Sequence, residues 1–502
     1  MNFLVALPSR TRLLDAGLVL VIGLVISISL CVAAYLPPKW TVFILFMIIV
    51  AACFGIVRQR EKLLLYLSIV LTSVFLSFHP IYLESDTFIW PVRGFRISIF
   101  EVVFFCLMIS WLVRLAADPR LKTNLFPWIS VPFLLIWCLS LAGLSRTPMP
   151  DIIKFSNLWL LFESWLIFLY FANNIRDRQT VLNIAAVLLF TGVLQALLGM
   201  AQYVSGGLLG LQVFGETKSY NLMEAGTEII SRVTGTFGHP NNLAGYLVML
   251  VLINLALLLA PLSRGTKLAL CLTLALIGTT LILTFSRGGW LALSLGGMFT
   301  LYLCFLRWSR HKVLSLLLSL VLLLVFVIST VGFITPLRQR LFLEDYGAAE
   351  SRIPMTRVAL NIIDHHPWLG IGLGNYIFAA PDYDITPEGI SYEFPLPVHN
   401  EFLLIAAEQG LPALALFLTI FLYMVIQLFR LSQSRADPLL PYLAIGLLGT
   451  FLAWAVFRLT DYNYVLLGDP FWLLAGFALA LVQVSRREMA TSPAEETAYN
   501  SR

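Results

Sequence analysis

Charged residues are what this 502-residue chain lacks most, because Asp, Glu, Lys and Arg together make up only 12% of it, against about a quarter of a soluble domain. Apolar residues make up 59%. So few charges cannot cover the surface of a soluble protein of this length, which excludes a soluble fold. The formal net charge of +5 is small and the Lys and Arg residues are dispersed along the chain, which excludes a basic face for nucleic acid.

Metal-binding cysteine patterns are missing as well. The six cysteines all fall inside apolar runs, and none forms a CxxC pair or a Cys/His cluster. Zinc sites and disulfide frameworks depend on such spacings, so the sequence predicts no metal site, no cofactor and no disulfides. No internal repeat is visible, so the inverted-repeat architecture of many transporters is not supported.

Long apolar runs are abundant instead. A bilayer-spanning helix needs about 20 mostly apolar residues. The predicted spans are residues 13–36, 40–57, 63–78, 97–113, 125–145, 156–173, 180–203, 241–262, 268–285, 289–306, 313–335, 400–429, 440–457 and 467–485. We therefore expect an all-α polytopic membrane protein of about fourteen transmembrane helices, with residues 1–502 forming a single integral membrane domain. The first run is too long for the apolar core of a cleavable signal peptide.

The basic residues predict which side of the membrane each loop faces. Loops rich in Lys and Arg stay in the cytoplasm. When the N-terminus is placed in the cytoplasm, the most basic loops are cytoplasmic as well; these are residues 58–62, 176–178, 264–267 and 307–312. The C-terminal tail, residues 486–502, is then cytoplasmic too. Two long loops, 205–239 and 336–398, are left outside, and we expect the chemistry to be located at that face.

The second external loop is predicted to contain a short amphipathic helix. Within residues 351–366, four apolar residues recur at helical spacing, namely Met355, Val358, Ala359 and Ile362. Pro354 suits the first turn of a helix. We expect this helix to lie at the outer membrane surface; the alternative is an irregular loop with a few apolar residues.

Two arginines at the predicted outer face are candidate phosphate ligands. Arg287 lies between two apolar runs with hardly any loop, and Arg232 precedes the mouth of the span at 241–262. A guanidinium offers a planar fork of donors suited to phosphate oxygens, and an unpaired arginine facing hydrocarbon is costly. The alternatives are an arginine that extends to lipid headgroups and an ordinary loop arginine.

His399 is the candidate general base, at the point where the long external loop enters the span at 400–429. A neutral imidazole can take a proton from an attacking hydroxyl at ordinary pH, and the positive end of the following helix disfavours its protonation. The alternative is an interfacial histidine bonded to a loop carbonyl. Asn400 beside it and His239, which we expect to cap or pack rather than act as a base, are secondary candidates.

Other polar residues are weaker candidates. Arg352 and Arg357 could reach the site from the loop helix, or they could simply be solvated or lipid-facing charges. GIGLG (370–374) resembles a phosphate loop but does not lie between a strand and a helix, and Asp382 and Asp384 form a DxD that we interpret as a solvated turn. Three acids inside predicted spans could instead form a proton or ion path, namely Glu101, Glu163 and Glu408.

Four sequence blocks follow one another in the second part of the chain, namely GTFGHPNNLAGYL, TFSRGGWLAL, HPWLGIGLGNY and VHNEFLLIAAEQGLPAL. As a set they resemble the O-antigen ligase and polymerase superfamily, and the spans from 180 to 485 follow its arrangement. Residues 1–170 resemble it only in being multispan. The predicted number of spans exceeds the number we associate with the ligases.

The resemblance implies a GT-C-like membrane glycosyltransferase at the outer face of the bacterial cytoplasmic membrane. It implies a polyprenyl-pyrophosphate-linked glycan as donor, a hydroxyl of a lipid or glycan acceptor, and a metal-independent, inverting reaction. Carried over to this sequence, Arg287 and Arg232 bind the donor pyrophosphate and His399 activates the acceptor. Two alternatives stay open, an O-antigen or exopolysaccharide polymerase of the same family and a non-enzymatic solute transporter of the bicarbonate type.

Overall fold

The computed structural model of the protein describes residues 38–56, 59–82, 94–118, 123, 127–147, 149–217, 222–225, 228–308, 311–321, 350–467 and 470–491. The predicted first span, 13–36, lies outside the described residues. So do residues 322–335 of the predicted eleventh span, 336–349 of the second long loop and 492–502 of the tail.

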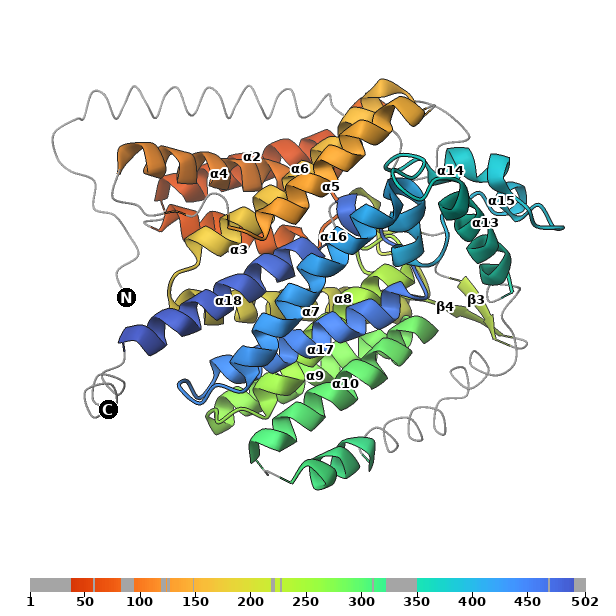
Figure 1. Cartoon of the computed structure of the whole chain (residues 1–502). Coiled ribbons are helices and arrows are strands. Elements are labelled where there is room, and N and C mark those ends of the chain that lie inside the picture. Colours follow the sequence, from red (N-terminus) through yellow and green to blue (C-terminus); the bar gives the residue numbers. More distant parts are fainter. Residues whose placement is uncertain are drawn as a thin grey trace, which may run out of the picture.

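Helices make up most of the described chain (Figure 1). The long ones are α2 (Pro38–Ile56), α3 (Arg60–Leu71), α4 (Ile99–Ala117), α5 (Ser130–Gly143), α6 (Asp151–Asn174), α7 (Arg178–Ser205), α8 (Pro240–Leu258), α9 (Arg264–Leu283), α10 (Arg287–Trp308), α13 (Arg352–His365), α16 (Glu401–Ser432), α17 (Leu440–Arg458) and α18 (Phe471–Thr491). Helices α14 (Tyr376–Ala379) and α15 (Ile390–Glu393) are short. Two antiparallel strand pairs, β1 (Ser77–Tyr82) with β2 (Gly94–Ser98) and β3 (Leu222–Ala225) with β4 (Glu228–Ser231), complete the fold.

Eight of the described helices are long and apolar enough to cross a membrane, namely α4, α6, α7, α8, α9, α10, α16 and α17. The prediction of a helical, multi-pass membrane protein is therefore confirmed in outline. The predicted number of fourteen spans stays a prediction, because the described residues contain eight such helices. Helix α18 starts and ends later than its predicted span, 467–485, and continues through the first residues of the predicted tail.

The predicted span at 63–78 is wrong. Helix α3 has 12 residues and ends at Leu71, so at 1.5 Å per residue it is about 18 Å long, too short for a bilayer core of about 30 Å. The hydroxyls of Thr72 and Ser73 donate back to the carbonyls of Ile69 and Val70 and compete with helix continuation. The chain then forms β1, which pairs with β2 ahead of α4.

Helices α8, α10 and α17 form the tightest part of the bundle. The share of the apolar 18-residue segment that is buried inside the protein is 83% in α17 and 72% in α8. Small residues allow this approach: a Cβ on Gly449 would lie 1.9 Å from Thr300 Oγ1, and one on Gly446 would lie 2.8 Å from Ile253 Cα. Because these helices are packed at fixed distances, their ends hold the adjoining loops in defined positions.

Helix α16 is bent at Gly410, where the segment at 368–374 packs closely against it. Gly410 inside it has φ 82°, and a Cβ there would meet the Trp368 carbonyl oxygen at 2.3 Å. The GIGLG segment packs on this bend, with Ile371 N–H donating to the Ala407 carbonyl and Gly372 N–H to the Glu408 carbonyl. In the structure the glycine-rich segment therefore shapes the helix that follows His399.

Helix α13 confirms the predicted loop helix, and the four apolar residues that predicted it are buried. Met355, Val358, Ala359 and Ile362 are all buried, and α13 packs against α16. This face is covered by protein, so lipid could reach only the other side, where Ile353 and Leu360 are exposed.

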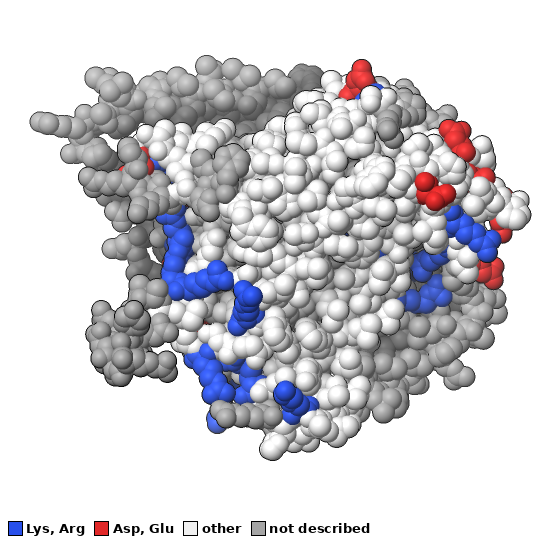
Figure 2. Space-filling view, in the orientation of Figure 1, with Lys and Arg blue, Asp and Glu red and all other residues white. Residues whose placement is uncertain are grey.

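Charges are distributed unevenly along the bundle. Figure 2 shows most visible Lys and Arg toward the end where α18 finishes, while most visible Asp and Glu lie at the opposite end, around α13 to α15, together with a smaller group of Lys and Arg. At the basic end Arg178 pairs with Asp437 at 2.7 Å, and Arg307 donates to the Ser432 carbonyl at 2.7 Å. This polarity is the pattern that the positive-inside rule associates with a cytoplasmic and an external face.

Candidate functional site

The start of α8 holds Arg232 in a defined position. The loop at 233–238 is fixed by α7, whose Gln202 Oε1 accepts the N–H groups of Thr234 and Gly235. Arg232 Nε donates to the Thr284 carbonyl at 2.8 Å, and its Nη2 donates to Asn241 Oδ1 at 3.1 Å. The arginine is thus half-buried and bridges the chain ahead of α8 and the turn between α9 and α10.

The turn between α9 and α10 presents Arg287 beside this arrangement. Arg287 is the first residue of α10 and follows the Thr284 carbonyl by three residues. Phe285, inside the turn, has a left-handed backbone with φ 49°, and such strained non-glycine residues are frequent at functional sites. A Cβ on Gly288 would meet Thr460 Oγ1 at 2.9 Å, so this helix start lies against the end of α17.

The start of α16 holds His399. Asn400 is the N-cap residue, and its Oδ1 accepts the N–H groups of Phe402 and Leu403 at 3.1 Å. Glu401 follows, and its carboxylate accepts the N–H groups of Asn463 and Val465, both at 2.7 Å. The loop after α17 is thereby attached to the helix that His399 precedes.

That loop supplies an acid, Asp461, at the centre of the arrangement. Its Oδ2 accepts the Asn241 amide at 3.0 Å, and Asn241 in turn accepts from Arg232. The next residue, Tyr462, stacks edge-on against His399 with ring centroids 5.3 Å apart. Segments that are more than 200 residues apart in the sequence therefore meet at one place.

The two histidines of the site are kept neutral. Burial lowers the pKa of His239 to about 4; the charges of Arg232 and His399 add to this effect and Asp461 opposes it. Burial also lowers the pKa of His399, together with the charge of Arg352, while Asp461 and the backbone of Pro397 favour protonation. His239 Nδ1 accepts the Asn241 N–H at 3.1 Å, so this histidine serves as the N-cap of α8.

The candidate residues from the sequence are thus largely brought together. Asp461 and its partner Asn241 interact with three of them, namely Arg232, His239 and His399. Arg287 lies three residues after Thr284, whose carbonyl accepts from Arg232. Arg352, at the start of α13, lies close enough to influence His399. Arg357 is exposed on the same helix, and Asn400 caps α16.

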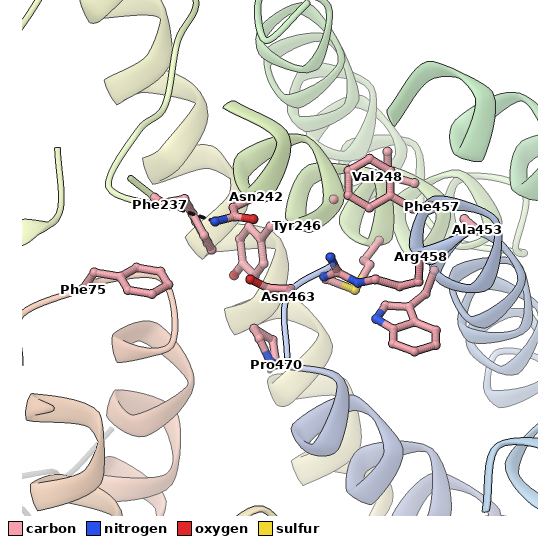
Figure 3. Close-up of a pocket in the computed structure, with 13 residues that line it drawn as sticks. Phe75, Phe237, Asn242, Tyr246, Val248, Ala453, Phe457, Arg458, Asn463 and Pro470 are labelled. Atoms are coloured by element: carbon pink, nitrogen blue, oxygen red, sulfur yellow. Dashed lines mark hydrogen bonds between the residues drawn. The ribbon is translucent and has the colours of Figure 1, made fainter. Parts of the chain in front are cut away.

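A cavity of about 490 Å³ of empty space, open solvent included, lies beside this arrangement (Figure 3). Its walls come from the start of α8, the end of α17 and the adjoining loops. Asn242 follows Asn241 of the site, and Asn463 follows Asp461 by two residues. Arg458, at the end of α17, is 5% exposed and lines the cavity.

Part of this chain is similar to a known protein family. Residues 272–418 match the family model described as O-antigen ligase. The predicted resemblance to the O-antigen ligase superfamily is confirmed. A search of curated proteins gives no significant match. A chain from the solved structure titled "Structural coordination of polymerization and crosslinking by a peptidoglycan synthase complex" is 17% identical, with 73% of this chain and 99% of that chain covered and a TM-score of 0.40.

The O-antigen ligase match supports a membrane glycosyltransferase of the ligase or polymerase type in general. The matched segment begins inside α9 and ends inside α16, and it contains Arg287, the α13 to α15 region and His399. Arg232, Asp461 and Arg458 lie outside it. The last two are candidate residues that sequence reasoning missed; a signal was present, since Arg458 and Asp461 interrupt apolar sequence at the end of a predicted span.

Proposed function

We propose that the protein is a metal-independent, inverting membrane glycosyltransferase that moves a glycan from a polyprenyl-pyrophosphate donor to an acceptor hydroxyl. The reaction takes place at the outer face of the bacterial cytoplasmic membrane, with both termini in the cytoplasm. The observation that carries the proposal is the bond chain from Arg232 through Asn241 to Asp461, whose charge acts on His399. The family match supports the class of reaction, and the charge polarity of the bundle supports the orientation.

The arginines act on the leaving group. Breaking a bond between sugar and phosphate places negative charge on the departing pyrophosphate, and fixed cations aimed at that charge lower the barrier. Arg232 is held at Nε and Nη2 by Thr284 and Asn241, so its orientation is set before substrate binds. Arg287, at the first position of α10, adds the second guanidinium, next to a helix start that itself favours anions.

His399 acts on the acceptor. Burial keeps its pKa below the ordinary value, so the imidazole is neutral and can accept the proton of an attacking hydroxyl. Asp461 moderates this effect, because its negative charge stabilises the imidazolium that forms. The carboxylate of Asp461, the imidazole of His399 and the guanidinium groups of the two arginines therefore have separate roles in one transfer step.

A polymerase of the same family would use the same residues, with a lipid-linked glycan as acceptor. The transporter alternative needs the intramembrane acids to line a common path. Glu408 instead binds the end of the GIGLG segment, since its carboxylate accepts the N–H groups of Gly374 and Tyr376 at 2.8 and 3.0 Å. Glu101 forms a capping box with Ser98 at the start of α4. Two of the three acids therefore hold local structure, which favours the enzyme.

The experiment is transfer of a labelled glycan from its polyprenyl pyrophosphate by the purified chain in lipid, with release of polyprenyl pyrophosphate as a second readout. His399→Ala should lower the rate by about 10²- to 10⁴-fold. His365→Ala is the matched control, because it makes the same change at an exposed histidine at the end of α13. Full activity of His399→Ala would remove the mechanism, and transport of a solute without transfer would favour the alternative.

A further inference from the structure

Glu163 is the third intramembrane acid, and its surroundings differ from those of Glu101 and Glu408. It lies near the middle of α6, a helix long and apolar enough to cross a membrane, and it is 3% exposed. Its Oε1 is buried and has no hydrogen-bond partner within the described part of the chain. A carboxylate buried in this way is costly, and a neutral carboxylic acid is much less so.

Glu101 is placed to carry a negative charge. Its Oε2 accepts the N–H of Ser98 at 2.8 Å, in the first turn of α4, where the helix dipole favours an anion. Nη2 of Arg96, on β2, lies 4.0 Å from Glu101 Oε1. Each of these contacts favours the ionised carboxylate, so Glu101 balances the charge of Arg96.

Glu163 lies close to this ion pair. Strand β2 packs against α6, and Phe105 of α4 lies against Trp159 of α6, with ring centroids 5.5 Å apart. Trp159 precedes Glu163 by about one helical turn. The charges of Glu101 and Arg96 both act on Glu163, so the three groups form one electrostatic cluster.

The other elements that pack closely on α6 are α5, α18 and the short helix η4 (Val465–Leu467). Neither α5 nor η4 contains a charged residue, and the thiol of Cys138 on α5 is exposed. In α18 the charged residues lie at 486–488, at the end next to Arg176, which follows α6. The charges that matter at the middle of α6 are therefore those of the cluster itself.

One guanidinium cannot neutralise two carboxylates. With both acids ionised, the cluster would carry a net negative charge inside the bundle, and like charges disfavour each other's ionisation. One bound proton removes this charge. The helix start and the Ser98 N–H stabilise the anion at Glu101, whereas Glu163 Oε1 accepts no hydrogen bond from any described residue. The proton is therefore expected on Glu163.

We propose that Glu163 binds a proton at neutral pH, as a neutral carboxylic acid in a buried site that Glu101 and Arg96 complete. The site is separate from the transfer site, whose described bonds run from Arg232 to Asp461. The inference goes beyond the proposed transfer reaction, because proton binding can be measured without a glycan donor.

Infrared difference spectroscopy tests the proposal on the purified full chain in lipid. The carbonyl stretch of a carboxylic acid is resolved from the bands of carboxylates and of backbone amides. The spectrum of wild type minus Glu163→Gln at pH 7 should contain a carboxylic acid band and no carboxylate bands. Asp151→Asn is the matched control on the same helix, because that side chain is 99% exposed and pairs with Lys154 at 3.2 Å. Its difference spectrum should contain carboxylate bands alone.

A pH titration of wild type and Glu101→Gln needs no Glu163 variant, so it covers the case in which Glu163→Gln fails to fold. Glu101→Gln removes the neighbouring negative charge and leaves Arg96 beside Glu163. The acid band should therefore give way to carboxylate bands at a lower pH than in wild type.

Unfolding in detergent supplies an independent readout. An unfolded glutamate releases its proton at about pH 4.3, whereas the folded chain keeps the proton on Glu163, so wild type should lose stability as the pH rises above that value. Glu163→Gln cannot ionise. Relative to this variant, the unfolding equilibrium of wild type should shift toward the unfolded chain by up to about tenfold per pH unit between about pH 5 and pH 7.

Three outcomes would overturn the proposal. Carboxylate bands in the difference spectrum of Glu163→Gln at pH 7 would show that Glu163 is ionised. An acid band that responds identically to pH in wild type and Glu101→Gln would separate the two acids. A stability difference between wild type and Glu163→Gln that does not change with pH would show that folding takes up no proton there. Each of these results would leave the proposed function intact, because glycan transfer is measured separately.

Discussion

Glu401 offers the sharpest test of how the site is assembled. Its carboxylate is 1% exposed and accepts the N–H groups of Asn463 and Val465, both at 2.7 Å. The loop that carries Asp461 is therefore held against the start of α16, two residues after His399. Glu401→Gln keeps the shape of the side chain but replaces one acceptor oxygen with a donor amide.

The expected magnitude follows from these two bonds. A hydrogen bond to a charged group contributes about 1.5–3 kcal/mol, and a buried N–H left without an acceptor costs about 1–3 kcal/mol. Loss of the charge and of one acceptor should lower the free energy of opening this loop by about 2–4 kcal/mol. Since 1.4 kcal/mol is tenfold, 2 kcal/mol is about 30-fold in the opening equilibrium.

Hydrogen exchange of the backbone amides measures this directly. In Glu401→Gln the amides of Asn463 and Val465 should exchange about 30-fold faster or more, and glycan transfer should fall because Asp461 is no longer held. Glu388→Gln, at an exposed acid just before α15, is the control and should leave both amides unchanged. Unchanged exchange in Glu401→Gln would refute the reasoning that this carboxylate fixes the loop.

Three further predictions concern pH, capping and the helix bend. Because burial lowers the pKa of His399, the acid limb of the pH–rate profile should lie below pH 6.5, and Asp461→Asn should move it lower still; an acid limb above pH 7 would contradict this assignment. His239→Ala should lower stability by about 1 kcal/mol through loss of the α8 cap, whereas His239→Asn should retain it, as measured by thermal unfolding. Gly410→Ala should destabilise the protein by about 2–5 kcal/mol, given its φ of 82° and a Cβ position 2.3 Å from a carbonyl oxygen, while Gly278→Ala, where a Cβ meets nothing within 4 Å, should be neutral or slightly stabilising in the same assay.

Much of the helical fold is accessible from the sequence because lipid imposes a simple rule on helix length and polarity. Helices α8, α10, α16 and α17 begin within two residues of their predicted spans. Helix α13 was predicted from the spacing of Met355, Val358, Ala359 and Ile362, the residues that it buries. The end of α3 was not predicted, because hydropathy continues through Thr72 and Ser73 while their hydroxyls compete with helix continuation.

The site was only partly accessible for a different reason. Arg287 and His399 stand in recognisable sequence blocks, and Arg232 precedes another. Asp461 and Arg458 have no comparable block, and their relation to the site arises from tertiary packing. The bond from Asp461 to Asn241 crosses 220 residues of sequence, and helical periodicity carries no information about such a contact.

The central claim is that Arg287 binds the glycan donor while His399 activates the acceptor in the same transfer reaction. Donor binding and glycan transfer, measured on the same preparations in lipid, test this most directly. His399→Ala should bind the polyprenyl-pyrophosphate glycan as wild type does and fail to transfer it, and Arg287→Lys should lose donor affinity because an ammonium lacks the guanidinium fork. Wild-type transfer by His399→Ala, or wild-type donor binding and turnover by Arg287→Lys, would contradict the account.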